Sequence, residues 1–146
     1  MCDFLIANIL LPLGSGILGV LGSLWLVSYK FQHAVYLDLV KKRLVALQNF
    51  LFLVEVFLKY KKKDSDLPQE LIDKLTKENL TNSVFIPPEL RDDWDNIWPH
   101  LTDLLVTNKI NELNLNIDSL RKTKNKINNY INKEYKKVNI LEKGLF

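Results

Sequence analysis

Carboxylates gather at one place in the sequence, where Asp92, Asp93 and Asp95 surround Trp94. Oxygen ligands this close together could hold a divalent metal ion. The same residue type is also favoured in the first turn of a helix, where a negative charge opposes the positive end of the helix dipole. We favour the helix interpretation, so no metal site is predicted here.

Other residue types that carry chemistry are sparse. His33 and His100 are the only histidines, and neither belongs to a recognisable zinc-ligand pattern. Cys2 is the only cysteine, which excludes a disulfide within the chain. The sequence also lacks a nucleophile elbow and a glycine-rich phosphate loop. We therefore expect no catalytic residues, no metal and no cofactor, and the protein is predicted not to be an enzyme.

Charge is segregated along the 146 residues. The net charge of +3 conceals +6 for residues 30–63, −7 for residues 64–103 and +6 for residues 121–146. This order favours docking of the acidic middle on its basic neighbours. One dominant basic face is typical of nucleic-acid-binding proteins, so a nucleic-acid partner is disfavoured. The lysines are expected on solvated helix faces, with contact to anionic lipid as the alternative.

The N-terminal region is uncharged over a long stretch. Phe4 to Tyr29 is a run of 26 residues without a charge, and it would form a helix of about 39 Å. Because a bilayer core is only about 30 Å thick, residues 1–30 are predicted to be a transmembrane anchor with some tilt. A cleaved signal peptide is the alternative. It is disfavoured because Asp3 replaces the usual basic start and no A-x-A site follows.

Basic residues after the run give the anchor a direction. Lys30, Lys41, Lys42 and Arg43 follow it, and no Lys or Arg precedes it. The positive-inside rule then predicts an N-terminus outside and the rest of the chain in the cytoplasm, in a single-pass protein of a membrane such as the bacterial inner membrane.

Small residues recur within the anchor. Ser15, Gly19 and Ser23 follow one another every four residues, with Gly22 beside them. Small side chains at this spacing let two helices approach closely in lipid, where apolar side chains gain nothing by preferring one another. We expect these four residues to form a packing face for self-association.

Two heptad patterns follow the anchor. The first predicts a long juxtamembrane helix over residues 31–64, and the second predicts a coiled-coil-like C-terminal helix over residues 101–146 that Lys124 and Glu134 interrupt. A second membrane span over residues 44–58 is the alternative for the first pattern, but the 15 residues between Arg43 and Lys59 are too few and include the charge of Glu55. The seam residues expected to pack together are Leu44, Leu47, Leu51, Val54, Leu113, Ile117, Leu120 and Ile127.

An acidic connector, residues 65–100, lies between the two patterns. Asp66 is expected to cap a short helix that has Pro68 in its first turn, and a second short helix is expected from Glu89, with a kink or restart at Pro99. Trp94 and Trp98, one turn apart, are expected as core anchors and not as a ligand cage. The predicted fold is thus all-α: one transmembrane helix, then two long antiparallel helices bridged by short ones.

Together these patterns predict a membrane-anchored interaction or scaffold protein. It would self-associate or dock a partner at the cytoplasmic face of the bilayer. The alternative is a membrane-perturbing effector of the phage lysis, exclusion or abortive-infection type, which acts through oligomers of its glycine-rich spans.

Overall fold

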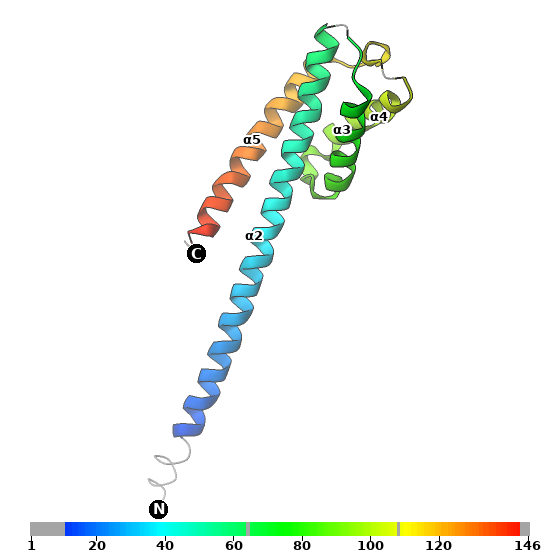
Figure 1. The fold of residues 1–146 in the computed structure, drawn as a ribbon. Coiled ribbons are helices and arrows are strands. Elements are labelled where there is room, and N and C mark those ends of the chain that lie inside the picture. The colour runs from blue at the N-terminus through cyan, green and yellow to red at the C-terminus, as the bar shows by residue number, and fades with distance from the viewer. Residues whose placement is uncertain (1–10, 64, 108, 144–146) are drawn as a thin grey trace, which may run out of the picture. The chain divides into compact units, whose positions relative to one another are not determined.

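The computed structural model describes residues 11–63, 65–107 and 109–143, with side chains from Gly19 onward apart from that of Asn111. Every regular element in these residues is helical, which confirms the predicted all-α class (Figure 1). The chain divides into two units, the first up to Leu37 and the second from Asp38 to Phe146. The helix α2 (Leu11–Lys63) contributes to both.

The part of α2 in the first unit is apolar and has little cover. No helix within the described residues combines the length and apolar character that a membrane crossing needs. That finding leaves the predicted span from Phe4 to Tyr29 without support, and residues 4–10 of the span lie outside the described residues. Residues 31–64, predicted as a separate helix, continue the same helix without a break as far as Lys63.

In the second unit α2 supplies the centre of the core. Phe50, Leu53, Val54 and Phe57 are completely buried. A helix segment that is apolar on nearly every side must be covered on several sides, and here the later helices provide that cover. These residues therefore belong to a protein core, which agrees with the preference for a core helix over a second span.

Short helices cover one side of this core. They are α3 (Gln69–Asn82), the 3₁₀ turns η2 (Ser83–Phe85) and η3 (Pro88–Leu90), and α4 (Arg91–Thr107). The N-cap of α3 is Pro68 and makes no side-chain hydrogen bond, so the predicted Asp66 cap is wrong. Pro99 lies inside α4, which continues for two more turns beyond it.

The predicted helix over residues 101–146 is in fact two helices. α4 ends at Thr107, η4 (Ile110–Glu112) follows as a single turn, and α5 (Ile117–Glu142) begins after an extended stretch. Asparagine side chains compete for local backbone groups and favour caps over helix interiors, and at this break Asn116 caps α5.

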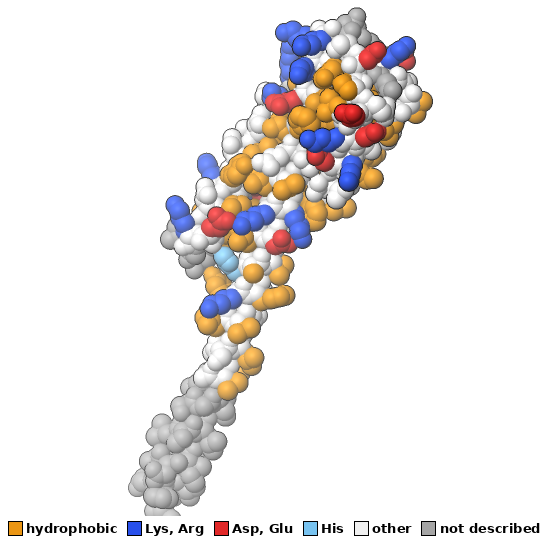
Figure 2. All heavy atoms as spheres, in the orientation of Figure 1, with side chains coloured by type: hydrophobic (Ala, Val, Ile, Leu, Met, Phe, Trp, Pro, Cys, Tyr) orange, Lys and Arg blue, Asp and Glu red, His pale blue; other side chains and the backbone are white. Residues whose placement is uncertain are grey.

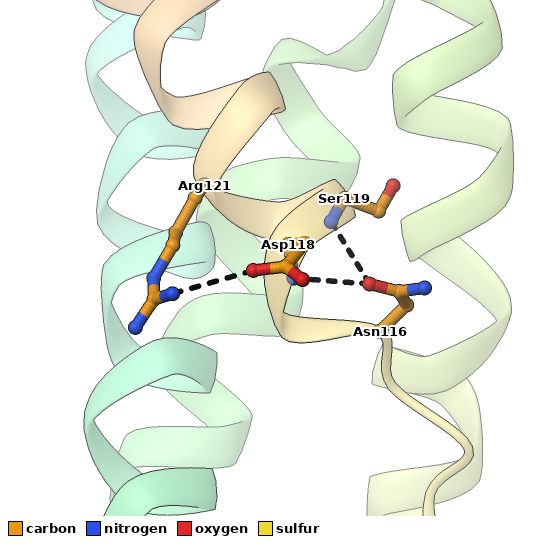
Figure 3. A network of polar contacts seen from close by, with 4 residues as sticks. All are labelled: Asn116, Asp118, Ser119 and Arg121. Atoms are coloured by element: carbon orange, nitrogen blue, oxygen red, sulfur yellow. Dashed lines mark hydrogen bonds and ion pairs between the residues drawn. The ribbon is translucent and has the colours of Figure 1, made fainter.

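Asn116 starts α5. Its Oδ1 accepts hydrogen bonds from the backbone N–H groups of Asp118 and Ser119, each at 3.0 Å, and Arg121 approaches Asp118 one turn later (Figure 3). These bonds satisfy two of the N–H groups that a helix start leaves without partners. The α5 helix then runs antiparallel to the second-unit part of α2, as Figure 1 shows.

Candidate interaction surfaces

The predicted seam residues differ in burial. Leu47, Val54, Leu113, Leu120 and Ile127 are buried in the core of the second unit, and Leu44 and Leu51 are half-buried. The prediction that Ile117 is buried is wrong, because its side chain is 36% exposed. Ile117 is the first residue of α5, so it lies just before the helix contacts the core. Leu113 follows η4 in extended conformation and thus packs from the linker instead of from a long helix.

Three side-chain contacts set the register between α2 and α5. Lys41 pairs with Glu142 at 2.8 Å, Gln48 donates to the Tyr135 hydroxyl at 2.9 Å, and Lys124 pairs with Glu55 at 2.7 Å. These groups are all substantially exposed, so each contact is weak by itself. Lys124, one of the two residues that interrupt the C-terminal heptad pattern, thus forms an ion pair with α2 at the edge of the seam.

Glu134, the other interruption, is buried within the second unit. Its side chain is 4% exposed and pairs with Lys137 on the same helix through Oε1. Its second oxygen, Oε2, is buried without a hydrogen-bond partner. A buried carboxylate oxygen without a partner costs free energy, so this residue does not act as a stabilising cross-link.

One residue of the acidic cluster around Trp94, Asp93, joins α4 to α5. Asp93 Oδ1 accepts from the hydroxyl of Thr123 at 2.8 Å, and Asp93 Oδ2 pairs with Lys126 at 2.7 Å. The hydrogen bond and the charge of Asp93 raise the pKa of Lys126 above its usual value of 10.5. Asp92 and Asp93 occupy the first turn of α4, as the helix-dipole interpretation predicts. The described residues contain no group of His, Cys, Asp or Glu arranged to hold a metal ion.

Replacing Asp93 tests this junction. Asp93→Ala should lower the free energy of unfolding by about 1–2 kcal/mol, because the Thr123 hydroxyl, on a residue only 2% exposed, loses its acceptor. Asp93→Asn is the matched control: its amide oxygen can still accept from Thr123, so it should cost less. Chemical denaturation of the three chains measures both values. Equal losses for the two variants would show that the charge, and not the acceptor, matters.

The tryptophan pair belongs to the core. Trp94 is 4% exposed, stacks on Trp98 with ring centroids 5.2 Å apart, and meets Phe50 edge-on at 5.1 Å. Edge-on and stacked arrangements of this kind add to the stability that burial provides. This arrangement matches the expected core role.

The first unit presents a surface of another kind. Between Gly19 and Leu37 the large apolar side chains are exposed on every side of α2, and the ring of Trp25 stacks on that of Tyr29 at 5.9 Å. We call residues 19–37 the apolar segment. Its most exposed apolar residues are Val20, Leu21, Leu24, Trp25, Val27 and Phe31.

The predicted packing face lies within this stretch of α2. A Cβ atom added at Gly19 or Gly22 would meet nothing within 4 Å, and the Ser23 hydroxyl donates to the Gly19 carbonyl of its own helix. The Ser15 side chain lies outside the described residues. Among the residues whose side chains are described, none fills the space beside the two glycines.

Sequence reasoning missed a third surface, on the second unit. Lysines lie over aromatic rings there: Lys59 over Tyr60 and Lys74 over Phe52, with Nζ 5.7 and 5.9 Å from the ring centroids. The second pair joins α3 to α2 across 22 positions in sequence, so no local pattern could reveal it. Hydrophobic side chains reach the surface among lysines and carboxylates on the face that Figure 2 shows.

Comparison of the chain with known protein families, with curated proteins and with solved structures finds no match.

Proposed function

We propose that this protein is a membrane-tethered helical interaction module that self-associates or docks a partner at the membrane face. The observation that carries the proposal is the apolar segment, whose side chains are exposed all around the helix. A helix that is apolar on every side is normally covered, either by protein or by lipid. The uncharged run that begins at Phe4 would extend this segment to the length of a bilayer core.

Aromatic residues support the same arrangement. Trp25, Tyr29 and Phe31 are exposed near Lys30, the first charged residue after the uncharged run. Tryptophan and tyrosine are enriched at the boundary between lipid tails and water, since they combine an apolar ring with a polar group. We infer that the chain leaves the bilayer at this position.

The proposed topology places the N-terminus outside and the second unit in the cytoplasm. Its support is the cluster of Lys41, Lys42 and Arg43 after the apolar segment. Lys41 and Lys42 form ion pairs with Glu142 and Asp38, but the positive-inside rule counts lysine and arginine and not the net charge. A reporter fused after Phe146 should therefore be active only as a cytoplasmic protein. Activity of the reporter in the periplasm would contradict the topology. Release of a shortened chain would contradict it as well and would favour a cleaved signal peptide.

Self-association through the small residues is the first molecular consequence. Gly19→Ile should keep the anchor inserted, because isoleucine is more apolar than glycine, yet reduce association by separating two helices at their closest approach. Among the described residues, a Cβ atom at Gly19 meets no side chain and no other element within 4 Å, so an effect on association would not come from a clash with them.

A membrane two-hybrid assay of residues 1–37 measures this association. Leu21→Ile is the matched control, because Leu21 lies about 200° around the helix from Gly19 and the change conserves volume. Equal signals for Gly19→Ile and the unaltered chain would show that the small residues do not form the interface.

The alternative is a membrane-perturbing effector built from oligomers of the same segment. The open space beside Gly19 and Gly22 favours it as well, since closely packed spans could form a pore. Induced expression with a membrane-potential dye separates the two functions. A tethered interaction module leaves the potential unchanged, whereas rapid depolarisation assigns the effector function.

A further inference from the structure

A groove runs between α2 and α3 on the surface of the second unit. It has a volume of about 270 Å³ and is lined by Phe52, Glu55, Val56, Lys59, Tyr60 and Leu71. Small-molecule sites usually begin near 300 Å³ and enclose most of their ligand, so this open groove is small for a cofactor. Its size suits one or two apolar side chains that a larger partner inserts.

Apolar side chains form the floor of this groove. Phe52 is 39% exposed, which is high for a phenylalanine whose neighbours Leu53 and Val54 are completely buried. Leu71 and Tyr60 are half-buried beside it. An exposed aromatic ring that lines a hollow offers a partner apolar surface, and aromatic residues are enriched among interface anchors.

Two lysines lie over aromatic rings of this groove. Lys59 lies over the Tyr60 ring and Lys74 over the Phe52 ring. Outside the groove, Lys42 of α2 lies 5.8 Å from the centroid of the Phe85 ring in η2. The Tyr60 and Phe52 rings of the groove thus each carry a cation at one face.

Glu55, which lines the groove, and Glu78 beside it each already have a lysine partner. Glu55 is engaged by Lys124 at 2.7 Å, and Glu78 is 3.9 Å from Lys74, at the limit of an ion pair. No carboxylate of the described residues lies within 4.0 Å of the Lys59 ammonium group. The groove therefore combines an apolar floor with cations that could still accept an anionic partner.

We propose that this groove binds an amphipathic acidic helix of a partner protein, with an apolar side chain on Phe52 and carboxylates on Lys59 and Lys74. Helices dock into apolar grooves through residues one turn apart, and flanking charges fix their orientation. The inference rests on the proposed interaction function but not on the membrane anchor, because every residue involved belongs to the second unit.

A pair of synthetic peptides tests the proposal on the full chain in nanodiscs of zwitterionic lipid, with empty nanodiscs as the blank. Each peptide has about 15 residues, a length at which a helix begins to be stable, and an apolar stripe of Leu and Phe. One peptide carries Glu beside the stripe, and the other carries Lys at the same positions. Fluorescence polarisation of labelled peptide should detect binding of the Glu peptide only.

Charge reversal in the groove should reverse this preference. The double variant Lys59→Glu, Lys74→Glu should weaken binding of the Glu peptide by roughly tenfold or more and should bind the Lys peptide instead. The matched control, Lys122→Glu, makes the same change on an exposed position of α5 and should leave binding unaltered. Circular dichroism verifies that all variants remain helical.

Three outcomes would overturn the proposal: no binding of the Glu peptide, equal binding of both peptides, or equal loss in the Lys122→Glu control. Self-association that is lost in the double variant, without peptide binding, would assign the groove to a second copy of this chain. If the chain fails to enter nanodiscs, the membrane anchor fails, and the peptide assay in buffer still decides the groove.

Discussion

Ile127→Asp is expected to lower the free energy of unfolding by about 4 kcal/mol or more, enough to unfold a marginal domain. Ile127 is completely buried in the core of the second unit, so an aspartate there would be a charge without water or a partner. The result should appear as loss of cooperative thermal melting by circular dichroism.

Ile117→Asp provides the matched control for this change, since it alters the same residue type on the same helix. The Ile117 side chain is 36% exposed and begins α5, where a negative charge is favoured by the helix dipole. Its cost should be less than about 1 kcal/mol. Similar losses for the two variants would mean that α5 packs from its first residue, against the arrangement described above.

Glu134→Leu is expected to raise the free energy of unfolding by about 2–3 kcal/mol, because replacing a buried ion by an apolar residue of similar volume is often stabilising. Glu134 is the one carboxylate among the described residues that is buried with an oxygen lacking a partner. Lys137, its present partner, is 42% exposed and would be hydrated after the change.

Glu142→Leu is the comparison for this second variant. Glu142 pairs with Lys41 at the surface, with about half of each side chain exposed, so its loss should change stability by no more than about 0.5 kcal/mol. Chemical denaturation of both variants gives the two values. If Glu134→Leu proved destabilising, the carboxylate would have a polar partner in solution that supports the α2–α5 packing.

Helical class and much of the core could be predicted from periodicity. Apolar residues at three- and four-residue spacing indicated a helix in the second-unit part of α2 and another in α5. Leu47 and Val54 of the first pattern and Leu120 and Ile127 of the second are buried. Such a pattern reports which side of a helix is apolar, and burial of that side is its main energetic consequence.

Periodicity misled over the stretch between α4 and α5. Ile110 and Leu113 are buried and fit the heptad spacing, but neither lies in an α-helix. Ile110 begins the short turn η4, and Leu113 follows that turn in extended conformation. The carbonyl oxygens of both residues accept from Lys61 Nζ, at 3.5 and 2.8 Å respectively, which supplies polar partners to backbone outside a helix. The local signal for the break was Asn116, a residue type that is favoured at helix caps.

The surfaces of the second unit could not be predicted for a different reason. The Asp93 junction and the groove around Phe52 depend on residues 22 to 33 positions apart, which come together only where α4 packs on α5 and α3 packs on α2. Charge segregation did indicate that acidic and basic segments dock on each other. It gave no means of pairing individual side chains.

The measurement that tests membrane tethering most directly is alkaline carbonate extraction of membranes from cells that express the full chain. The apolar segment and the uncharged run before it should keep the chain in the membrane pellet at full length, because carbonate removes proteins that are bound only through surface charge. Recovery of the full-length chain in the supernatant would contradict the tether, and the apolar segment would then need a protein partner as its cover.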